Sequence, residues 1–143
     1  MKKIIPFMAI IALLMTACRY DEPVFSLTSP ENRLVGYWNL QGVKLNNVAL
    51  DSAVNNANKP GNYYSFFYDG PMSVTAFISN QIFESTEGEW SFKNKYRELN
   101  INFVLRGQRF NYVADINKLS KRELKYTYKD NHGDEWQLTF YKR

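Results

Sequence analysis

Two residues of the chain, its single cysteine and its single histidine, have side chains that commonly act as nucleophiles or bases. Cys18 directly follows an apolar run, and His132 lies in the tetrapeptide DNHG, whose composition is typical of a turn. Cys–His catalysis and histidine/cysteine metal sites need several such side chains together, so both are excluded. A Ser-His-Asp triad would have to use a hairpin tip, which makes it an improbable arrangement.

Carboxylates are the remaining candidates for acid–base chemistry. Glu84, Glu87 and Glu89 form one group, and Asp134 and Glu135 form another. A glycosidase needs two carboxylates that face each other across a cleft, whereas these lie near the ends of predicted strands, where acids usually face solvent. The sequence contains no Gly-rich phosphate loop. We therefore expect a protein that is not an enzyme and that uses no metal and no cofactor.

The N-terminus has the pattern of an export signal. Lys2 and Lys3 precede an almost unbroken apolar run over residues 4–15. This run is too short to cross a bilayer, which needs roughly 20 residues. A short positive segment followed by such a run is typical of a secretory signal, so we predict a signal peptide over residues 1–17.

Residues 14–18, LMTAC, resemble the lipobox of bacterial lipoproteins. That resemblance implies that the Cys18 thiol is lipidated and that the chain is cut just before it. Two or three acyl chains hold a protein durably on a membrane. It also implies a lipidated tether over residues 18–29 and an anchor in the outer membrane of a Gram-negative cell envelope. Residues 19–22, RYDE, resemble surface-export signals but equally fit a solvated tether, so the face of the membrane stays open.

The charge of the mature chain is nearly balanced. The signal peptide removes two of the 18 Lys and Arg residues and none of the 14 Asp and Glu residues, which leaves 16 basic residues. An excess of two is too small to indicate a polyanionic partner. Basic residues do flank two tyrosines near the C-terminus, as on single-strand nucleic-acid platforms: Lys121, Arg122, Lys125 and Lys129 around Tyr126 and Tyr128. Export from the cytoplasm argues against that use, so we expect no nucleic-acid partner.

From Gly36 onward, apolar and polar residues alternate with a period of two, which predicts strands with one buried face. Ser29-Pro30-Glu31 precedes them and has the pattern of a short helical start. Turn residues separate the strands at near-regular spacing. We therefore predict an all-β protein, an antiparallel up-and-down β-barrel of about eight to nine strands after a short helical turn. A two-sheet sandwich is the alternative. The barrel domain is predicted over residues 30–143.

One connection, residues 46–62, is too long for a hairpin loop, for which 2–5 residues are usual. Asp51 could cap a short helix over residues 52–57. The many asparagines and the Lys59-Pro60-Gly61 sequence indicate a surface loop.

The sequence resembles the lipocalin-like domains of small bacterial lipoproteins. The resemblance rests on Leu34-x-Gly36-x-Trp38, on the segment GEWSF that contains Trp90, and on the C-terminal segments INKLSKREL and FYK. It implies a barrel of about eight strands that is open at one end. It further implies structural roles for Gly36, Trp38 and Trp90, with Trp38 at the closed end, and a lid formed by the long first loop.

Two functions follow as hypotheses. In the first, the barrel interior holds a small apolar or amphipathic ligand. Its candidate lining consists of inward aromatic residues, which could also simply fill the barrel: Phe66, Tyr68, Phe103, Phe110, Tyr112, Tyr126 and Tyr128.

In the second hypothesis, the protein is an accessory or interaction subunit of a cell-envelope protein assembly. It would need an exposed aromatic patch. Residues of outward parity could supply one: Tyr37, Tyr63, Phe67, Phe77, Val104, Val113 and Tyr141. A hollow barrel would favour the first hypothesis, and a filled barrel with an aromatic outer patch would favour the second.

Overall fold

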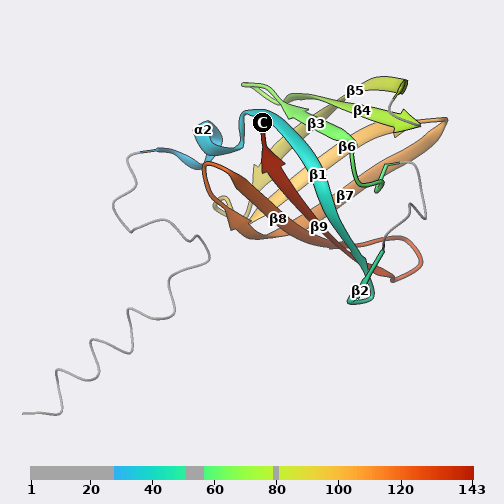
Figure 1. The fold of residues 1–143 in the computed structure, drawn as a ribbon. Helices are drawn as coiled ribbons and strands as arrows, with labels where there is room; N and C mark the ends of the chain where they lie inside the picture. The colour runs from blue at the N-terminus through green and yellow to red at the C-terminus, as the bar shows by residue number, and fades with distance from the viewer. Residues whose placement is uncertain (1–27, 51–56, 79–80) are drawn as a thin grey trace, which may run out of the picture.

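The computed structural model describes residues 28–50, 57–78 and 81–143 (Figure 1). The predicted signal peptide, Cys18 and most of the tether lie outside these residues. The same holds for Asp51 and most of its predicted helix, and for Ser79 and Asn80, whose residue types predict one of the turns between strands. No helix within the described ranges is long and apolar enough to cross a lipid bilayer.

A single helical turn, α2 (Pro30–Leu34), precedes the sheet, as the sequence predicts. The Ser29 side chain accepts a hydrogen bond from the backbone N–H of Asn32 at 3.2 Å, which satisfies one of the donors left open at a helix start. Pro30 fits the first turn because its missing N–H would have no helical partner there.

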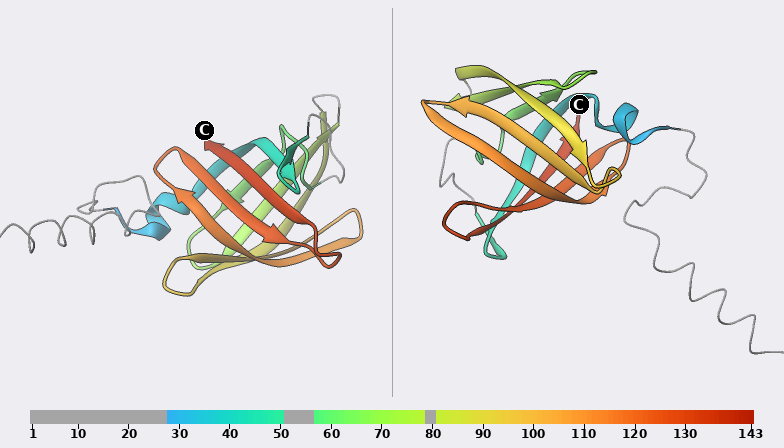
Figure 2. Two further views of the ribbon diagram at one scale, coloured as in Figure 1. Left: turned by 90° about the horizontal axis from the view of Figure 1, so that it is seen from below. Right: turned by 180° about the vertical axis from the view of Figure 1, so that it is seen from behind.

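In the described parts of the chain, nine strands form one antiparallel sheet, in which β1 also pairs with β9. Their bounds are β1 (Gly36–Leu45), β2 (Val48–Ala49), β3 (Tyr63–Phe66), β4 (Pro71–Ile78), β5 (Gln81–Lys93), β6 (Glu98–Leu105), β7 (Gln108–Leu119), β8 (Glu123–Lys129) and β9 (Glu135–Lys142). The β1–β9 pairing closes β1 and β3 to β9 into an eight-stranded barrel, and β2 adds a short hairpin to β1 (Figure 2). Closure confirms the predicted barrel and rules out the two-sheet sandwich, because a sandwich has free strand edges.

The alternation in the sequence becomes the inside and outside of the barrel. Along β7, for example, Phe110, Tyr112, Ala114 and Ile116 are buried and the residues between them are exposed. β-Bulges shift this register on three strands. On β1, the sequence pattern predicts Gly42 on the inner face, but the bulge between Leu40 and Gly42 buries Val43 instead.

One end of the barrel is closed by α2 and the start of β1. The indole Nε1 of Trp38 donates to the Leu34 carbonyl at 2.6 Å, and Trp38 has no exposed surface. Arg33 donates from Nη1 to the Leu119 carbonyl at 3.2 Å, and the Lys142 ammonium donates to the Arg33 carbonyl at 2.8 Å. These bonds hold α2 against β1, β7 and β9. They also agree with the expected position of Trp38 at the closed end.

Gly36 and Trp90 also lie at the closed end of the barrel. A Cβ on Gly36 would lie 2.6 Å from Lys142 Cε, and the φ of Gly36 is +133°, a conformation that side chains disfavour. Trp90 donates from its indole to the Phe67 carbonyl at 2.9 Å and contacts the ring of Phe66 edge-on, with centroids 6.0 Å apart. Gly36, Trp38 and Trp90 therefore lie together at the closed end.

Candidate functional site

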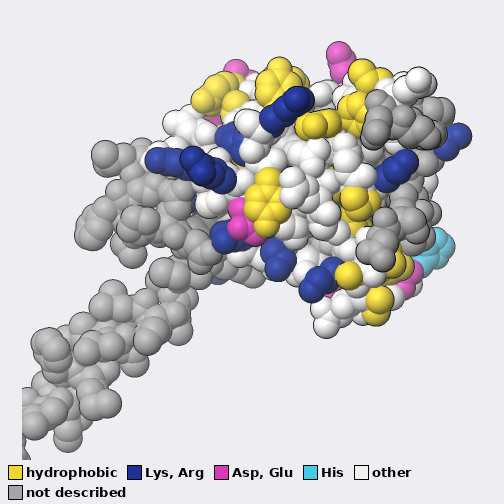
Figure 3. Space-filling model, viewed as in Figure 1, with side chains coloured by type: hydrophobic (Ala, Val, Ile, Leu, Met, Phe, Trp, Pro, Cys, Tyr) yellow, Lys and Arg dark blue, Asp and Glu magenta, His cyan; other side chains and the backbone are white. Residues whose placement is uncertain are grey.

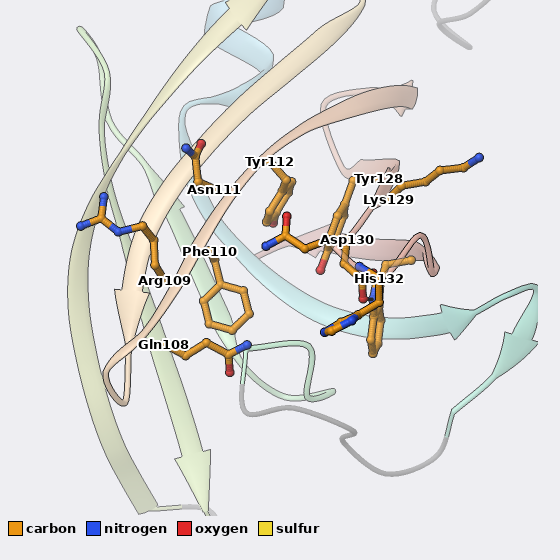
Figure 4. A pocket seen from close by; sticks show the side chains of 11 residues that line it. Gln108, Arg109, Phe110, Asn111, Tyr112, Tyr128, Lys129, Asp130 and His132 are labelled. Atoms are coloured by element: carbon orange, nitrogen blue, oxygen red, sulfur yellow. Dashed lines mark hydrogen bonds between the residues drawn. The ribbon is translucent and has the colours of Figure 1, made fainter.

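The opposite end of the barrel contains a pocket of about 130 Å³ (Figure 4). It lies where β7 begins and where β8 turns into β9. Its lining consists of Gln108, Arg109, Phe110, Asn111, Tyr112, Tyr128, Lys129, Asp130, Asn131, His132 and Trp136. Four of these residues are aromatic side chains from the barrel interior, and most of the others carry amide or charged groups. We call this space the mouth pocket.

The aromatic wall of the mouth pocket is set by strand alternation. Phe110 and Tyr112 are successive inward residues of β7, and Tyr128 is paired with Trp136 across β8 and β9. The rings of Tyr112 and Tyr128 are stacked, with centroids 3.8 Å apart and planes at 11°. Phe110 stacks on Phe103 at 4.9 Å. Such contacts hold the rings in fixed orientations and so give the pocket a preformed wall.

Below the mouth, aromatic side chains fill the barrel. The ring of Tyr64 lies edge-on to Phe103 at 5.9 Å and to Phe140 at 5.1 Å, and Tyr126 contacts Phe140 at 5.4 Å. Tyr64, Tyr126 and Phe140 have no exposed surface. A ligand that entered deeply would have to displace these packed rings, so the available space is at the mouth.

Four buried tyrosine hydroxyls lie beneath and beside the mouth pocket. The hydroxyls of Tyr112 and Tyr126 are 3.0 Å apart, and Tyr64 donates to the Ala57 carbonyl at 3.1 Å. The hydroxyl of Tyr128 accepts from the Asn58 side-chain amide at 2.7 Å. Burial raises the pKa of Tyr64, Tyr112 and Tyr126 well above the usual tyrosine value, and it raises the pKa of Tyr128 to about 12. All four side chains are therefore neutral hydrogen-bonding groups at physiological pH.

The end of the long first loop, residues 57–62, seals the barrel beside these tyrosines. Ala57, Asn58 and Asn62 are buried. Asn62 accepts from the backbone N–H of Phe77 at 3.1 Å and donates to the Ala57 carbonyl at 3.1 Å, and its backbone carbonyl accepts from the Leu40 N–H at 2.8 Å. The segment thus bridges β1 and β4 where β3 does not extend.

The expectation that this Asn-rich loop lies on the surface is wrong for Asn58 and Asn62. Their amides are buried because remote partners satisfy them, and buried polar groups are tolerated when they are hydrogen-bonded. The composition of the loop alone contains no signal for these partners, which come from β4 and β8.

The rim of the mouth pocket is organised by Asp130. Its carboxylate accepts from the Trp136 indole at 3.0 Å and from the backbone N–H groups of His132 and Asp134 at 2.8 and 3.0 Å. Burial tends to raise the pKa of Asp130, but these hydrogen bonds outweigh it and hold the pKa below its usual value. His132 lies in the β8–β9 turn, as the sequence predicts, and it borders the pocket.

The sequence-predicted lining residues divide into three groups: those that line the mouth pocket, those that fill the barrel, and Tyr68, which lies outside the barrel. Phe110, Tyr112 and Tyr128 line the mouth pocket. Phe66, Phe103 and Tyr126 are buried deeper, where they fill the barrel. Sequence reasoning missed Trp136 as a lining residue, although its inward parity on the last strand was visible in the sequence.

Tyr68 does not lie inside the barrel. It is 56 % exposed, and its hydroxyl donates to the Asn32 side chain at 2.9 Å. Strand β3 ends at Phe66 because the chain turns through Asp69 and Gly70, both at positive φ. The alternation that includes Tyr68 therefore continues two residues past the end of the strand.

The outward residues have the predicted parity. Tyr37, Phe67, Val104, Val113 and Tyr141 are exposed, and Tyr63 and Phe77 are half-buried. On the face shown in Figure 3, hydrophobic side chains (yellow) lie among Lys and Arg side chains (dark blue). Tyr37 and Phe67 meet edge-on at 6.4 Å, and Tyr63 and Phe77 meet at 5.4 Å.

A second hollow, of about 390 Å³, lies near the closed end at the β3–β4 turn. Its lining consists of Asp69, Gly70, Pro71, Gly88, Glu89, Trp90, Ser91 and Asn100. Trp90 is the single aromatic residue among them, and its indole N–H is already bonded to the Phe67 carbonyl. The hollow is larger than the mouth pocket but offers a ligand only one aromatic side chain.

Comparison with known proteins identifies the fold. No family model and no curated protein matches the sequence. The structure is similar to a lipocalin-like protein from Bacteroides uniformis, with a TM-score of 0.51 and 16% identity over 78% of this chain and 99% of the other. A protein from Bacteroides eggerthii (TM-score 0.49, 12% identity, 77% and 99% coverage) and a redesigned β-barrel (TM-score 0.44, 12% identity, 82% and 98% coverage) also match. The similarity to the Bacteroides uniformis protein shows that the barrel has a lipocalin-like fold.

Proposed function

We propose that this protein is a membrane-anchored lipoprotein of the cell envelope that binds a small amphipathic ligand at the mouth of its barrel and carries out no catalysis. The observation that carries the ligand-binding part of this proposal is the mouth pocket. Four interior aromatic residues converge there with amide and charged side chains at the open end of a barrel that is otherwise filled. Concave sites of this mixed composition are the usual binding sites for small molecules.

The size of the pocket limits the ligand. A space of about 130 Å³ is close to the roughly 150 Å³ cavity that holds one benzene molecule. Drug-sized ligands need about 300 Å³ or more. The apolar part of the ligand is therefore about one ring, and a long acyl chain would require the packed rings of Tyr64, Tyr126 and Phe140 to move.

The anchoring part of the proposal rests on the sequence of residues 1–18. Acyl chains on Cys18 would hold the protein on the outer membrane, and residues 18–29 would form the tether. The chain enters the barrel at α2, at the closed end. Twelve tether residues reach at most about 40 Å when extended. The tether would then join the barrel at the end opposite the mouth pocket and would leave the pocket uncovered.

Two experiments test the anchoring. Radiolabelled palmitate should label the mature protein in cells, and the Cys18→Ala variant should lose the label and should no longer be recovered in the membrane fraction. Protease treatment of intact cells then distinguishes the two faces, because only a surface-exposed domain is cut. Label retained by Cys18→Ala would contradict the assignment of Cys18.

A ligand titration tests the binding site. We expect single-ring compounds to bind the wild-type protein in ligand-observed NMR and to bind Phe110→Ala at least about 5-fold more weakly, because one wall of the pocket is removed. Val113→Ala is the matched control, since Val113 lies on the same strand with its side chain exposed. Equal losses in both variants would contradict the mouth pocket as the site.

A second candidate function is that of an accessory subunit of an envelope protein assembly. The filled interior favours this function, as expected for a barrel without an internal cavity, and so does the exposed aromatic pair of Tyr37 and Phe67. Ligand binding rests instead on the mouth pocket, which lies above the filled interior. Aromatic residues are enriched in protein interfaces. A photo-crosslinking amino acid at position 67 should capture a defined partner in intact cells. Recovery of uncrosslinked monomer alone would contradict this function.

A further inference from the structure

The hydrogen-bond donors at the mouth pocket are not all used. Each tyrosine hydroxyl has one proton to donate. Tyr64 donates its proton to the Ala57 carbonyl, and one of Tyr112 and Tyr126 donates to the other. Tyr128 accepts from Asn58, and among the described residues no group accepts the Tyr128 proton. The Tyr128 hydroxyl is therefore an available donor on a residue that lines the pocket.

Tyr128 is placed so that a ligand could use this donor. Figure 4 shows its ring reaching into the mouth opposite Phe110. The ring is held by its stack on Tyr112, and the hydroxyl oxygen is held by the Asn58 amide. A donor fixed on both sides loses little conformational entropy when it binds an acceptor. It also remains protonated, because burial raises the Tyr128 pKa.

The charges around the pocket do not favour an ionic ligand. Arg109 and Lys129 are exposed, and in Figure 4 their side chains point away from the space between Phe110 and Tyr128. The Asp130 carboxylate is occupied by the Trp136 indole and two backbone N–H groups. An ion that left water for this site would lose hydration without gaining a close counter-ion.

We propose that the mouth pocket binds an uncharged ring compound that carries a carbonyl-type acceptor oxygen, and that this oxygen accepts the Tyr128 hydroxyl proton. This inference rests on the proposed function and specifies its ligand class. The ring lies against the wall formed by Phe110, Tyr112 and Tyr128, and the acceptor points toward the Tyr128 hydroxyl. An apolar ring without an acceptor would leave that donor unpaired, which lowers affinity.

Three probes of one ring size test the inference: benzamide, benzoate and benzylamine, which at pH 7 are neutral, negative and positive. Each is titrated into the full chain and followed by ligand-observed NMR. We expect benzamide to bind at least about 5-fold more tightly than either ion. Tyr128→Phe, which keeps the ring stack and removes the donor, should weaken benzamide binding by about 5- to 10-fold.

Tyr141→Phe is the matched control, because Tyr141 is an exposed tyrosine on the outside of β9. It should leave benzamide binding unchanged. The wild-type preference among the probes is independent of any loss of stability in Tyr128→Phe. If benzoate or benzylamine binds as tightly as benzamide, the inference is overturned and the proposed function still stands. The same holds if Tyr128→Phe does not change the affinity for benzamide. Failure of all three probes to bind the wild type would overturn both.

Discussion

The side-chain amide of Asn58 donates to the hydroxyl of Tyr128 at 2.7 Å, across 70 residues of sequence. This bond joins the end of the first loop to β8 at the edge of the mouth pocket. Both residues are buried, and each satisfies a polar group of the other. The bond therefore connects the stability of the loop to the geometry of the candidate site.

Loss of this bond should destabilise the protein. We expect Asn58→Ala to lower the free energy of unfolding by about 1–3 kcal/mol, because the Tyr128 hydroxyl loses its buried donor. Urea unfolding followed by tryptophan fluorescence measures the change. Asn39→Ala is the matched control, since Asn39 is half-exposed on β1 and should cost less than about 0.5 kcal/mol. Equal effects of the two variants would show that the bond does not stabilise the loop.

Gly88 should be essential for the approach of β5 to β6. A Cβ at this position would lie 2.5 Å from the Asn102 carbonyl oxygen and 2.7 Å from Phe103 Cβ. We expect Gly88→Ala to cost about 1–3 kcal/mol, because backbone has to move. Gly42→Ala is the matched comparison, since its nearest contact would be Thr139 Cβ at 3.3 Å. A smaller loss of stability in Gly88→Ala than in Gly42→Ala would refute this account of the packing.

The tyrosine cluster predicts a loss of stability at alkaline pH. In the unfolded chain tyrosines ionise near pH 10, whereas burial raises the native pKa of Tyr128 to about 12 and also raises the pKa values of Tyr64, Tyr112 and Tyr126. The native state therefore retains protons that the unfolded state releases. The stabilisation that these tyrosines contribute is fully present below about pH 10, and it falls as pH rises through their native pKa values.

Urea unfolding between pH 9 and 11.5 measures this decline. The double variant Tyr112→Phe/Tyr126→Phe should be less stable at neutral pH and should show a shallower decline, because two of the coupled hydroxyls are absent. A decline of the same slope in the variant would mean that other groups cause it.

The hydrogen bonds of Asp130 lead us to expect that the protein also loses stability in acid. Its native pKa lies below the usual value near 3.9 because of bonds from Trp136, His132 and Asp134. Its contribution to stability is therefore complete above about pH 5 and is lost as pH falls through the native pKa. Asp130→Asn should reduce stability at pH 7 and flatten the pH dependence between about pH 5 and 2. A profile identical to that of the wild type would contradict the role of these bonds.

The sequence predicts the barrel well because burial of one strand face is a local pattern. The inward parity of Phe110, Tyr112, Tyr126 and Tyr128 follows from alternation alone. The prediction that Tyr68 points inward is wrong because alternation does not reveal where a strand ends and a turn begins.

The candidate site is less predictable for a different reason. The buried amides of Asn58 and Asn62 depend on partners from β4 and β8, and only the folded chain brings these together. Likewise, nothing in the alternation distinguishes residues that fill the barrel, such as Phe66, from Trp136 at the mouth. The difference is their height along the barrel axis, which depends on strand register.

The three tryptophans give the most direct test of the mouth pocket as the ligand site. Trp136 lines the pocket, whereas Trp38 and Trp90 lie at the closed end. Their indole N–H signals in a ¹H–¹⁵N spectrum of the full chain can be assigned with single Trp→Phe variants. During titration with benzamide, we predict that the Trp136 signal moves with ligand concentration while the Trp38 and Trp90 signals stay in place. Movement of the Trp90 signal with a stationary Trp136 signal would contradict the account, because it would move the binding site to the hollow at the closed end.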